Sequence, residues 1–280
     1  MNPSRLELEA PAKLNLFLEV VGRRPDGYHE IDSIFQEIDL CDRVTLEPSE
    51  RMELTVEGEA APSDNHNLAW RAAEALGRNV RIHLHKRIPP GAGLGGGSSD
   101  AAAVLRGVNR ICALDLSTEE LAAVAVELGA DVPYFLQGGL ARCRGIGEQV
   151  EILPAAPEKR FLLLLPGIET STAAVYASLK PGLTPKPGEA TVFYREFVGS
   201  GSGSARSYNR LQAVAEELDP RLKEVREAAE RRYGRRFCMT GSGSAYFTEL
   251  RDNEESPPGL LVTEAGIEVR TLKVCSGPRK

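Results

Sequence analysis

The sequence, 280 residues long, predicts an α+β fold. Three observations support this prediction. Apolar and polar residues alternate over residues 5–21, which is the period of a β-strand. Several later segments instead carry apolar residues at helical spacing and end at a glycine. Strands and helices do not alternate regularly along the chain, which favours separated strands and helices over a repeated βαβ series.

The part of the chain up to residue 153 is predicted to form strands and short helices around a glycine-rich loop. In residues 5–21 the leucines face one side while Lys13 and Asn15 share the other, so we expect a strand with one buried face. Ser117 and Glu120 have the spacing of a capping box. The other predictions are strands at 42–48, 52–58 and 80–88, helices at 67–77, 101–113 and 117–129, a tight turn at 130–139 and a hairpin at 139–153.

A segment rich in proline and small residues, 154–159, marks the predicted domain boundary. We expect one domain over residues 1–156 and a second over residues 157–280. Residues 181–206 combine prolines with a Gly-Ser run and are expected to form a mobile loop. The other predictions are strands at 160–167 and 268–275, helices at 171–179, 209–218, 220–234 and 259–266, and a strand, glycine turn and strand over 237–250.

The composition argues against several classes of protein. A net charge of −6 and an isoelectric point near 5.5 disfavour a nucleic-acid-binding protein. No apolar run approaches the roughly 18–20 residues of a membrane-spanning helix, and the first ten residues carry no hydrophobic signal segment. The five scattered cysteines form no CxxC pair, so they indicate neither a disulfide framework nor a zinc site. We expect a cytoplasmic protein that binds neither nucleic acid nor membrane.

The most informative stretch is PPGAGLGGGSSDAAAVL, residues 89–105. Its five glycines lack side chains and permit positive φ, so backbone N–H groups can turn toward a ligand. A helix that starts directly afterwards adds unpaired N–H donors and a partial positive charge. Phosphate is the usual occupant of such a cradle. Ser98 and Ser99 add hydroxyl groups that can bond it or ligate Mg²⁺, and Asp100 falls in the first turn, where a carboxylate suits the helix dipole.

Other interpretations of the glycine stretch are less well supported. It is not a Walker A loop, because no Gly-Lys-Ser/Thr follows at the required spacing. Gly91, Gly93 and Gly96 satisfy the GxGxxG pattern of a dinucleotide site, but no acidic residue ends a second strand about 20 residues later. A flexible linker is disfavoured because the run enters the helix without a spacer.

Residues 89–102 resemble the phosphate-binding motif of the GHMP small-molecule kinases, a family that includes galactokinase, homoserine kinase and mevalonate kinase. Residues 10–36 and 239–250 resemble the first and third motifs of that family. Within it, PAKLNLFLEV followed by RPDGYHEIDS is similar to the branch whose acceptor is a methylerythritol unit linked to cytidine diphosphate. The resemblance implies a two-domain GHMP kinase fold with the active site in the cleft between the domains.

The resemblance also implies an ATP-dependent kinase of non-mevalonate isoprenoid precursor biosynthesis, which phosphorylates the 2-hydroxyl of that acceptor. Lys13 and Asp131 match the catalytic pair of the family, and we expect them within ion-pair reach. The sequence leaves open whether Asp131 abstracts the hydroxyl proton or only orients the hydroxyl. Taken alone, Lys13 reads as a solvated strand residue and Asp131 as a turn or cap residue, but three motifs in the family's order favour catalysis.

The same resemblance assigns binding residues on both sides of the cleft. Tyr28 is expected to stack on the cytosine and His29 to contact its edge, with Tyr176 as the opposite wall or, alternatively, a core residue of its helix. The second glycine turn, residues 240–245, is expected to close over the phosphate end of the substrate and buttress the first loop. The remaining expected contacts are Asn15 and Thr172 for the acceptor, and Asn67, Lys86, Pro89, Pro90, Gly91, Ala92, Gly93, Leu94, Gly95, Gly96, Gly97, Ser98 and Ser99 for ATP.

Mg²⁺ is expected because ATP phosphates carry it, with Ser99 as its protein contact and water completing its shell. The oligomeric state is left open between monomer and homodimer. The alternative functions are a kinase acting on homoserine or mevalonate, a non-catalytic metabolite sensor of the same fold, and a dinucleotide-dependent oxidoreductase. The RPDGYHE segment with Tyr176 disfavours the first, since only a nucleotide-bearing acceptor needs two rings. The presence of both Lys13 and Asp131 disfavours the sensor.

Overall fold

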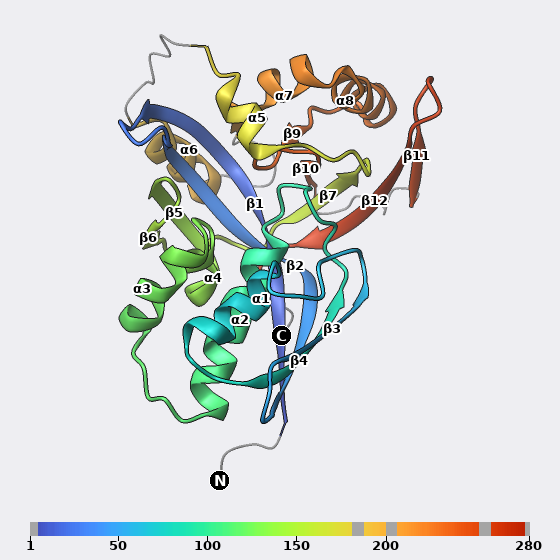
Figure 1. The fold of residues 1–280 in the computed structure, drawn as a ribbon. Coiled ribbons are helices and arrows are strands. Elements are labelled where there is room, and N and C mark those ends of the chain that lie inside the picture. Colours follow the sequence, from blue (N-terminus) through green and yellow to red (C-terminus); the bar gives the residue numbers. More distant parts are fainter. Residues whose placement is uncertain (1–4, 181–187, 200–205, 252–258, 278–280) are drawn as a thin grey trace.

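The computed structural model describes residues 5–180, 188–199, 206–251 and 259–277, and within them two sheets and eight helices form the mixed architecture that the sequence predicts (Figure 1). The first sheet has the strand order β3-β4-β2-β1-β8, with β5 paired to β2 and β6 to β5. Its strands are β1 (Leu6–Arg23), β2 (His29–Pro48), β3 (Glu53–Gly58), β4 (Val80–Lys86), β5 (Leu140–Gly145), β6 (Gln149–Ile152) and β8 (Tyr208–Asn209).

The second sheet is antiparallel throughout and has the order β11-β12-β7-β10-β9. It is built from β7 (Arg160–Leu165), β9 (Cys238–Met239), β10 (Tyr246–Leu250), β11 (Leu260–Val262) and β12 (Glu268–Cys275). The predicted helix at 259–266 is therefore wrong, because this segment contains β11. Leu261 is buried between the exposed Leu260 and Val262, and this alternation suits an edge strand paired with β12.

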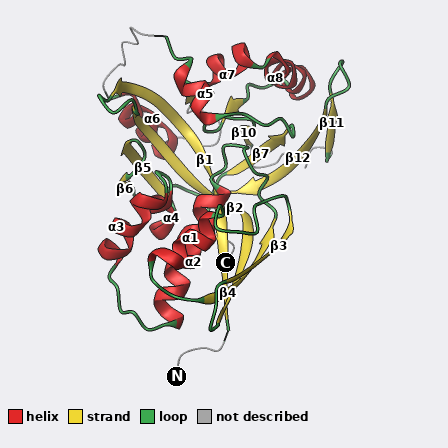
Figure 2. Cartoon of the chain, in the orientation of Figure 1, coloured by secondary structure: helices red, strands yellow, loops and turns green. Residues whose placement is uncertain are grey.

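Helices of the first half lie on one side of the first sheet, and α7 and α8 lie by the second (Figures 1 and 2). None of the helices in the described ranges is long and apolar enough to cross a membrane. The helices are α1 (Leu68–Ala75), α2 (Gly96–Ile111), α3 (Thr118–Leu128), α4 (Val132–Gln137), α5 (Thr172–Ala177), α6 (Glu189–Gly199), α7 (Gln212–Leu218) and α8 (Pro220–Tyr233).

The long antiparallel pair β1–β2 forms the centre of the molecule, and its register runs from Leu6 opposite Leu46 to Arg23 opposite His29. The prediction of one buried face for β1 is wrong, since residues 10–20 are buried on both faces. Leu14 and Leu16 belong to the same apolar cluster as residues of the second sheet. The opposite face carries Lys13 and Asn15, which are buried in the functional cavity described below.

Three other segments differ from the sequence prediction. Helix α2 begins at Gly96, five residues earlier than expected, because Gly95 takes the left-handed conformation (φ 75°) and starts the helix inside the glycine run. The predicted tight turn at 130–139 contains the short helix α4, which has a proline in its first turn. Residues 189–199, predicted as part of a mobile loop, form α6, whose Phe193 and Phe197 are buried against β1 and β2. Residues 181–187 and 200–205 of that predicted loop lie outside the described residues.

Candidate active site

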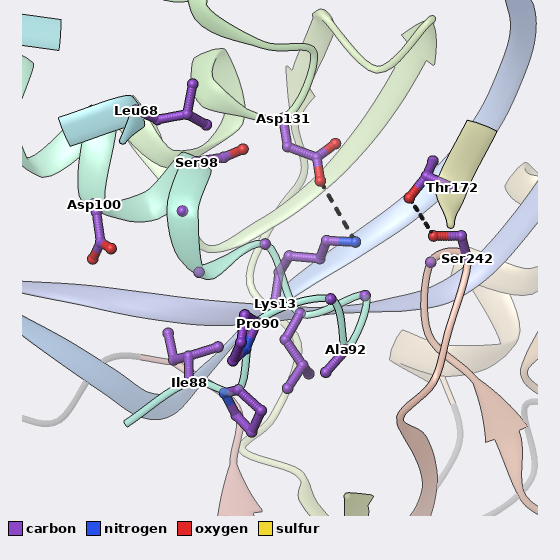
Figure 3. Close-up of a pocket in the computed structure, with 18 of the residues that line it drawn as sticks. Lys13, Leu68, Ile88, Pro90, Ala92, Ser98, Asp100, Asp131, Thr172 and Ser242 are labelled. Atoms are coloured by element: carbon purple, nitrogen blue, oxygen red, sulfur yellow. Dashed lines mark hydrogen bonds and ion pairs between the residues drawn. The ribbon is translucent and has the colours of Figure 1, made fainter. Parts of the chain in front are cut away.

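A cavity of about 550 Å³ lies where the two sheets meet, and its wall collects the sequence motifs. Segments far apart in the chain contribute to it: β1, the glycine loop with the first turn of α2, the start of α4, the start of α5, and the second glycine turn. Figure 3 shows Lys13 and Asp131 facing each other across this space, with Thr172 and Ser242 on the far side. The cavity therefore has the Lys13–Asp131 pair and the glycine-loop backbone on one side and the side chains of α5 and the second glycine turn on the other.

The glycine loop has a backbone that larger residues would not tolerate. Gly93 and Gly95 have positive φ angles of 74° and 75°. A Cβ atom at Gly93 would lie 2.1 Å from the carbonyl oxygen of Thr240, and one at Gly95 would lie 2.8 Å from the Phe135 ring. Both positions need glycine for close approach as well as for conformation. The loop then enters α2, whose first turn lines the cavity with N–H groups that have no partner within the helix.

The second glycine turn packs directly on the first loop, as the sequence predicted. The hydroxyl of Thr240 donates to the carbonyl oxygen of Gly93 (3.3 Å), and the N–H of Ala245 donates to that of Ala92 (3.2 Å). The same Thr240 hydroxyl accepts a hydrogen bond from the backbone N–H of Asn15 (3.0 Å). These contacts join β1, the loop and the second sheet into one support for the cavity floor.

Lys13 and Asp131 form the ion pair that the sequence predicted, with Nζ of Lys13 3.7 Å from Oδ2 of Asp131. The lysine side chain is 4% exposed and the aspartate side chain 29%. Burial lowers the pKa of Lys13, and the Asp131 carboxylate opposes this shift. The ammonium also lies 4.8 Å from the Phe35 ring centre, which is within cation–π range.

Asn15 and Asp131 are held in different ways. Asn15 accepts a hydrogen bond from Lys13 (2.5 Å) through Oδ1 and donates one to the Ser33 hydroxyl (3.1 Å), so its amide fixes the lysine side chain. Asp131 is the residue before α4, yet its side chain makes no capping hydrogen bond. Its carboxylate thus faces the cavity instead of serving the helix, which argues against the alternative of a simple cap residue.

The two residues predicted on the adenine side both line the cavity, but their polar groups are already bonded within the protein. Asn67 caps α1 by accepting from the N–H of Ala69 (2.9 Å), and it donates to the carbonyl oxygen of Pro62 (2.7 Å). Lys86 is buried between two carboxylates. Their side chains therefore shape this wall, and backbone groups, apolar groups and His66 remain available for a nucleotide here.

The two serines of the motif point in different directions. Ser98 lines the cavity, whereas the hydroxyl of Ser99 is buried and has no hydrogen-bond partner in the described part of the chain. Asp100 was expected in the first turn, where the helix dipole would stabilise its carboxylate. Because α2 begins at Gly96, Asp100 lies just beyond the first turn, and its carboxylate is instead buried beside Lys86. The early start of the helix causes both differences, because it rotates Ser99 and Asp100 into the protein.

The opposite end of the cavity is aromatic. The Tyr176 ring lines it and stacks on the His29 ring with a centroid distance of 5.4 Å. Tyr28 is 61% exposed and lies outside the cavity lining, so the expected group of three rings is only partly assembled. Burial, with a smaller effect of Arg23, lowers the pKa of His29. Thr172 lines the cavity beside these rings and bonds the Ser242 hydroxyl at 2.7 Å.

Comparison with known proteins places this site in a family. Residues 67–139 match the GHMP kinases N terminal domain, and residues 198–257 match the GHMP kinases C terminal domain. A 4-diphosphocytidyl-2-C-methyl-D-erythritol kinase of Citrifermentans bemidjiense is 41% identical over 87% of this chain and 89% of its own length. A second, from Pelobacter propionicus, is 38% identical over 93% and 96%. The chain belongs to the 4-diphosphocytidyl-2-C-methyl-D-erythritol kinase family.

Solved structures agree with this assignment. A crystal structure of 4-(cytidine 5'-diphospho)-2C-methyl-D-erythritol kinase aligns with a TM-score of 0.76 at 38% identity and covers 97% of this chain and 99% of its own. A homoserine kinase from Cytophaga hutchinsonii, at 18% identity and a TM-score of 0.69, shares the fold. The GHMP kinase resemblance and fold predicted from the three motifs are confirmed.

Among the residues that sequence reasoning missed are Ser242, which lines the cavity, and Asp42, which lies behind it against Lys86. Ser242 lies in the second glycine turn, and the Gly-Ser pattern there was a usable signal for a hydroxyl facing the cavity. Asp42 was missed because an aspartate inside a strand gives no local sign of its partner. Its position is fixed by the pairing of β2 with β4, in which Arg43 lies opposite His85 and Asp42 comes next to Lys86.

Proposed function

We propose that this chain transfers the γ-phosphoryl group of ATP to the 2-hydroxyl of 4-diphosphocytidyl-2-C-methyl-D-erythritol, giving ADP and the 2-phosphate. The substrate class comes from the family to which the chain belongs. The observation that carries the assignment to this site is the Lys13–Asp131 pair, which faces the cavity beside the glycine loop. A sensor of the same fold would have no need to keep a buried ammonium next to a carboxylate.

In the proposed reaction the chain supplies positioning and charge. The N–H groups of the glycine loop and of the first turn of α2 receive the phosphates, and the ammonium of Lys13 offsets charge on the transferred group. The acceptor oxygen forms its bond to the γ-phosphorus as the bond from that phosphorus to the β-phosphate oxygen breaks. The hydroxyl donates to Asp131, which takes its proton, and ADP leaves.

Mg²⁺ enters this proposal with ATP and not as a resident ion. In the described part of the chain no group of three or more His, Cys, Asp or Glu side chains could hold a metal. Beside the glycine loop, the hydroxyl of Ser98 and the carboxylate of Asp131 are side-chain oxygens that could ligate it, whereas Ser99 is not part of the cavity wall. When bound, Mg²⁺ would supply charge neutralisation at the phosphates.

The aromatic end of the cavity would hold the cytidine part of the acceptor. Tyr176 presents a ring face that His29 supports from behind, and stacking of a base on such a ring contributes roughly 1–3 kcal/mol. Tyr28, at the tip that joins β1 to β2, would cover the other face of the base. Thr172, bonded to Ser242, would contact the sugar and phosphate part.

We further propose that the chain works in the cytoplasm and divides into domains 1–156 and 157–280. Every strand of the second sheet lies at or after residue 160, which supports the division. One strand crosses the proposed boundary, because β8 comes from the second half of the chain but pairs with β1 in the first sheet. A segment of the second domain would thus add an edge strand to the sheet of the first domain.

An ADP-release assay with the purified chain and ATP-Mg tests the proposed function. The acceptor panel contains 4-diphosphocytidyl-2-C-methyl-D-erythritol, homoserine and mevalonate, and phosphorylated product is identified by mass. We expect turnover with the cytidylylated acceptor only. Turnover with homoserine or mevalonate and none with the cytidylylated compound would contradict the proposed substrate.

A further inference from the structure

Three ionisable side chains form a buried cluster next to the glycine loop. Lys86, the last residue of β4, donates to the carboxylates of Asp42 in β2 and of Asp100 in α2, the latter at 2.6 Å. The three side chains are between 0% and 4% exposed. Buried charges are tolerated only when they are paired. Each member of this cluster, named here the loop clamp, therefore depends on the other two.

The loop clamp also fixes the chain that leads into the glycine loop. Oδ1 of Asp42 accepts hydrogen bonds from the backbone N–H groups of Arg87 (2.5 Å) and Ile88 (2.9 Å). Two prolines follow, so no further N–H is available before the glycines. At the other end of the loop, a methyl group on Gly96 would lie 3.4 Å from Oδ2 of Asp42. One cluster thus bonds the entry to the loop and lies beside the start of α2.

Asp100 has a feature that a packing role does not explain. Its second oxygen, Oδ1, is buried and has no hydrogen-bond partner among the described residues, yet Asp100 forms part of the cavity wall. An unpaired buried carboxylate oxygen lowers stability. Figure 3 shows Asp100 on the side of α2 that faces away from Lys13 and Asp131, so it does not contact this pair. Its effect on the reaction must pass through the loop.

We propose that Asp100 is a positioning residue for ATP: through Lys86 and Asp42 it fixes the first turn of α2 relative to the entry of the glycine loop. The clamp thereby sets the spacing between the N–H groups that receive the phosphates. This inference rests on the proposed function, since it takes ATP as the ligand of the loop. It predicts that loss of Asp100 weakens nucleotide binding and leaves acceptor binding intact.

The test measures ADP binding to the purified chain by titration calorimetry, together with KM for each substrate. Asp100→Ala removes one arm of the clamp and is expected to raise the Kd for ADP at least tenfold. Asp100→Asn keeps an oxygen that accepts from Lys86, so its Kd is expected to rise threefold or less. KM for ATP should follow these changes, whereas KM for the acceptor stays within twofold. A general loss of structure would move both KM values.

Asp32 provides the matched control. It lies in β2, makes a bidentate ion pair with Arg142 at 2.7 and 2.8 Å, and is not part of the cavity wall. Asp32→Ala should lower the unfolding temperature and leave the Kd for ADP unchanged. A Kd within twofold of the original chain in Asp100→Ala, or equal weakening in Asp32→Ala, would overturn the clamp. Failure of the unmodified chain to bind ADP would contradict the proposed function itself.

Discussion

The two ends of the cavity are built in opposite ways. At the phosphate end, Lys13 and Asn15 are buried and bonded to each other, and the glycine loop is bonded to the second glycine turn. At the aromatic end, Tyr28 is 61% exposed, and the contact between His29 and Tyr176 is a ring stack between half-buried side chains. The phosphate end is fixed by contacts between residues of both halves of the chain. The aromatic end leaves ring faces exposed that a bound ligand would cover.

This difference indicates how each end would bind its part of the substrates. Groups that act on a transferring phosphoryl gain most when their positions are fixed in advance, since no reorganisation is then needed in the reaction. A base that stacks on rings can be bound by surfaces that stay half exposed until it arrives. Changes at the phosphate end should therefore affect rate and nucleotide binding, and changes at the aromatic end should affect acceptor binding.

The largest effect is expected for Asp131→Asn. This substitution keeps the shape of the side chain and removes the group that receives the hydroxyl proton, so kcat should fall by about 10³-fold, within the range for loss of a general base. Steady-state ADP release measures it. Because the substitution leaves the buried Lys13 ammonium without its carboxylate partner, the unfolding temperature should fall by roughly 3–10 °C, which corresponds to about 1–3 kcal/mol. Retention of a tenth of the original kcat would remove Asp131 from the reaction.

Gly93→Ala and Gly97→Ala should have opposite effects on stability. At Gly93 the new Cβ would lie 2.1 Å from a carbonyl oxygen with φ at 74°, so the free energy of unfolding should drop by about 3 kcal/mol or more. At Gly97 the nearest atom is 3.8 Å away and the backbone is helical, so alanine should stabilise α2 by about 0.5–1 kcal/mol.

The exposed methyl group of Gly97→Ala would nevertheless project from the wall that faces the phosphates. KM for ATP should therefore rise in this stable variant. Urea unfolding and KM for ATP, measured on both variants, separate the two effects. A Gly97→Ala chain with unchanged KM for ATP would place the phosphates elsewhere.

Asp100 should make stability depend on pH. Burial first, and then the neighbouring Asp42, raises the pKa of Asp100 to about 7 despite the opposing effect of Lys86. A carboxyl whose pKa is raised on folding contributes stability below its ordinary pKa near 4, and this contribution is lost as the pH rises through about 7. Asp100→Asn cannot titrate and therefore lacks this pH-dependent contribution. Urea unfolding at pH 5 and pH 8 should show the stability advantage of Asp100 over Asn shrinking by on the order of 2 kcal/mol. A constant or growing advantage would show that Asp100 is ionised throughout.

The smallest effect is expected at the aromatic end. Tyr176→Ala should raise KM for the cytidylylated acceptor about tenfold through loss of ring stacking, with KM for ATP within twofold. Tyr176→Phe keeps the ring face and should behave like the unmodified chain. If Tyr176→Ala raises both KM values equally, the contrast between the two ends of the cavity does not hold.

The parts of the site that depend on the conformation of a short stretch of chain could be predicted from the sequence. The glycine run signals a backbone cradle, and the three motifs correctly bring Lys13 near Asp131 across more than a hundred residues. Helices with strong periodicity or caps were found, as with the capping box of Ser117 and Glu120. In these helices the spacing of apolar and capping residues along the sequence directly indicates which residues share one face of the helix.

Tertiary contacts explain what could not be predicted. Strand residues 29–41 are buried at most positions, with buried residues next to one another from Ser33 to Ile38, so they show no alternation. Helix α6 is formed between Pro- and Gly-rich segments because Phe193 and Phe197 pack on the first sheet. Helix α2 begins within glycines because Gly95, whose missing side chain admits Phe135, caps it. The partners in the loop clamp lie 14 and 44 residues from Lys86 and meet only through sheet register and helix packing.

The most direct test is a crystal structure of the chain with a non-hydrolysable ATP analogue and the cytidylylated acceptor. We predict that the phosphates contact backbone N–H groups between residues 91 and 98, and that the acceptor 2-hydroxyl lies within hydrogen-bond distance of Asp131, roughly 2.6–3.2 Å. Lys13 should face the γ-phosphate, and the cytosine should lie against Tyr176. A triphosphate bound away from the glycine loop, or a 2-hydroxyl on the side of the cavity away from Asp131, would contradict the account.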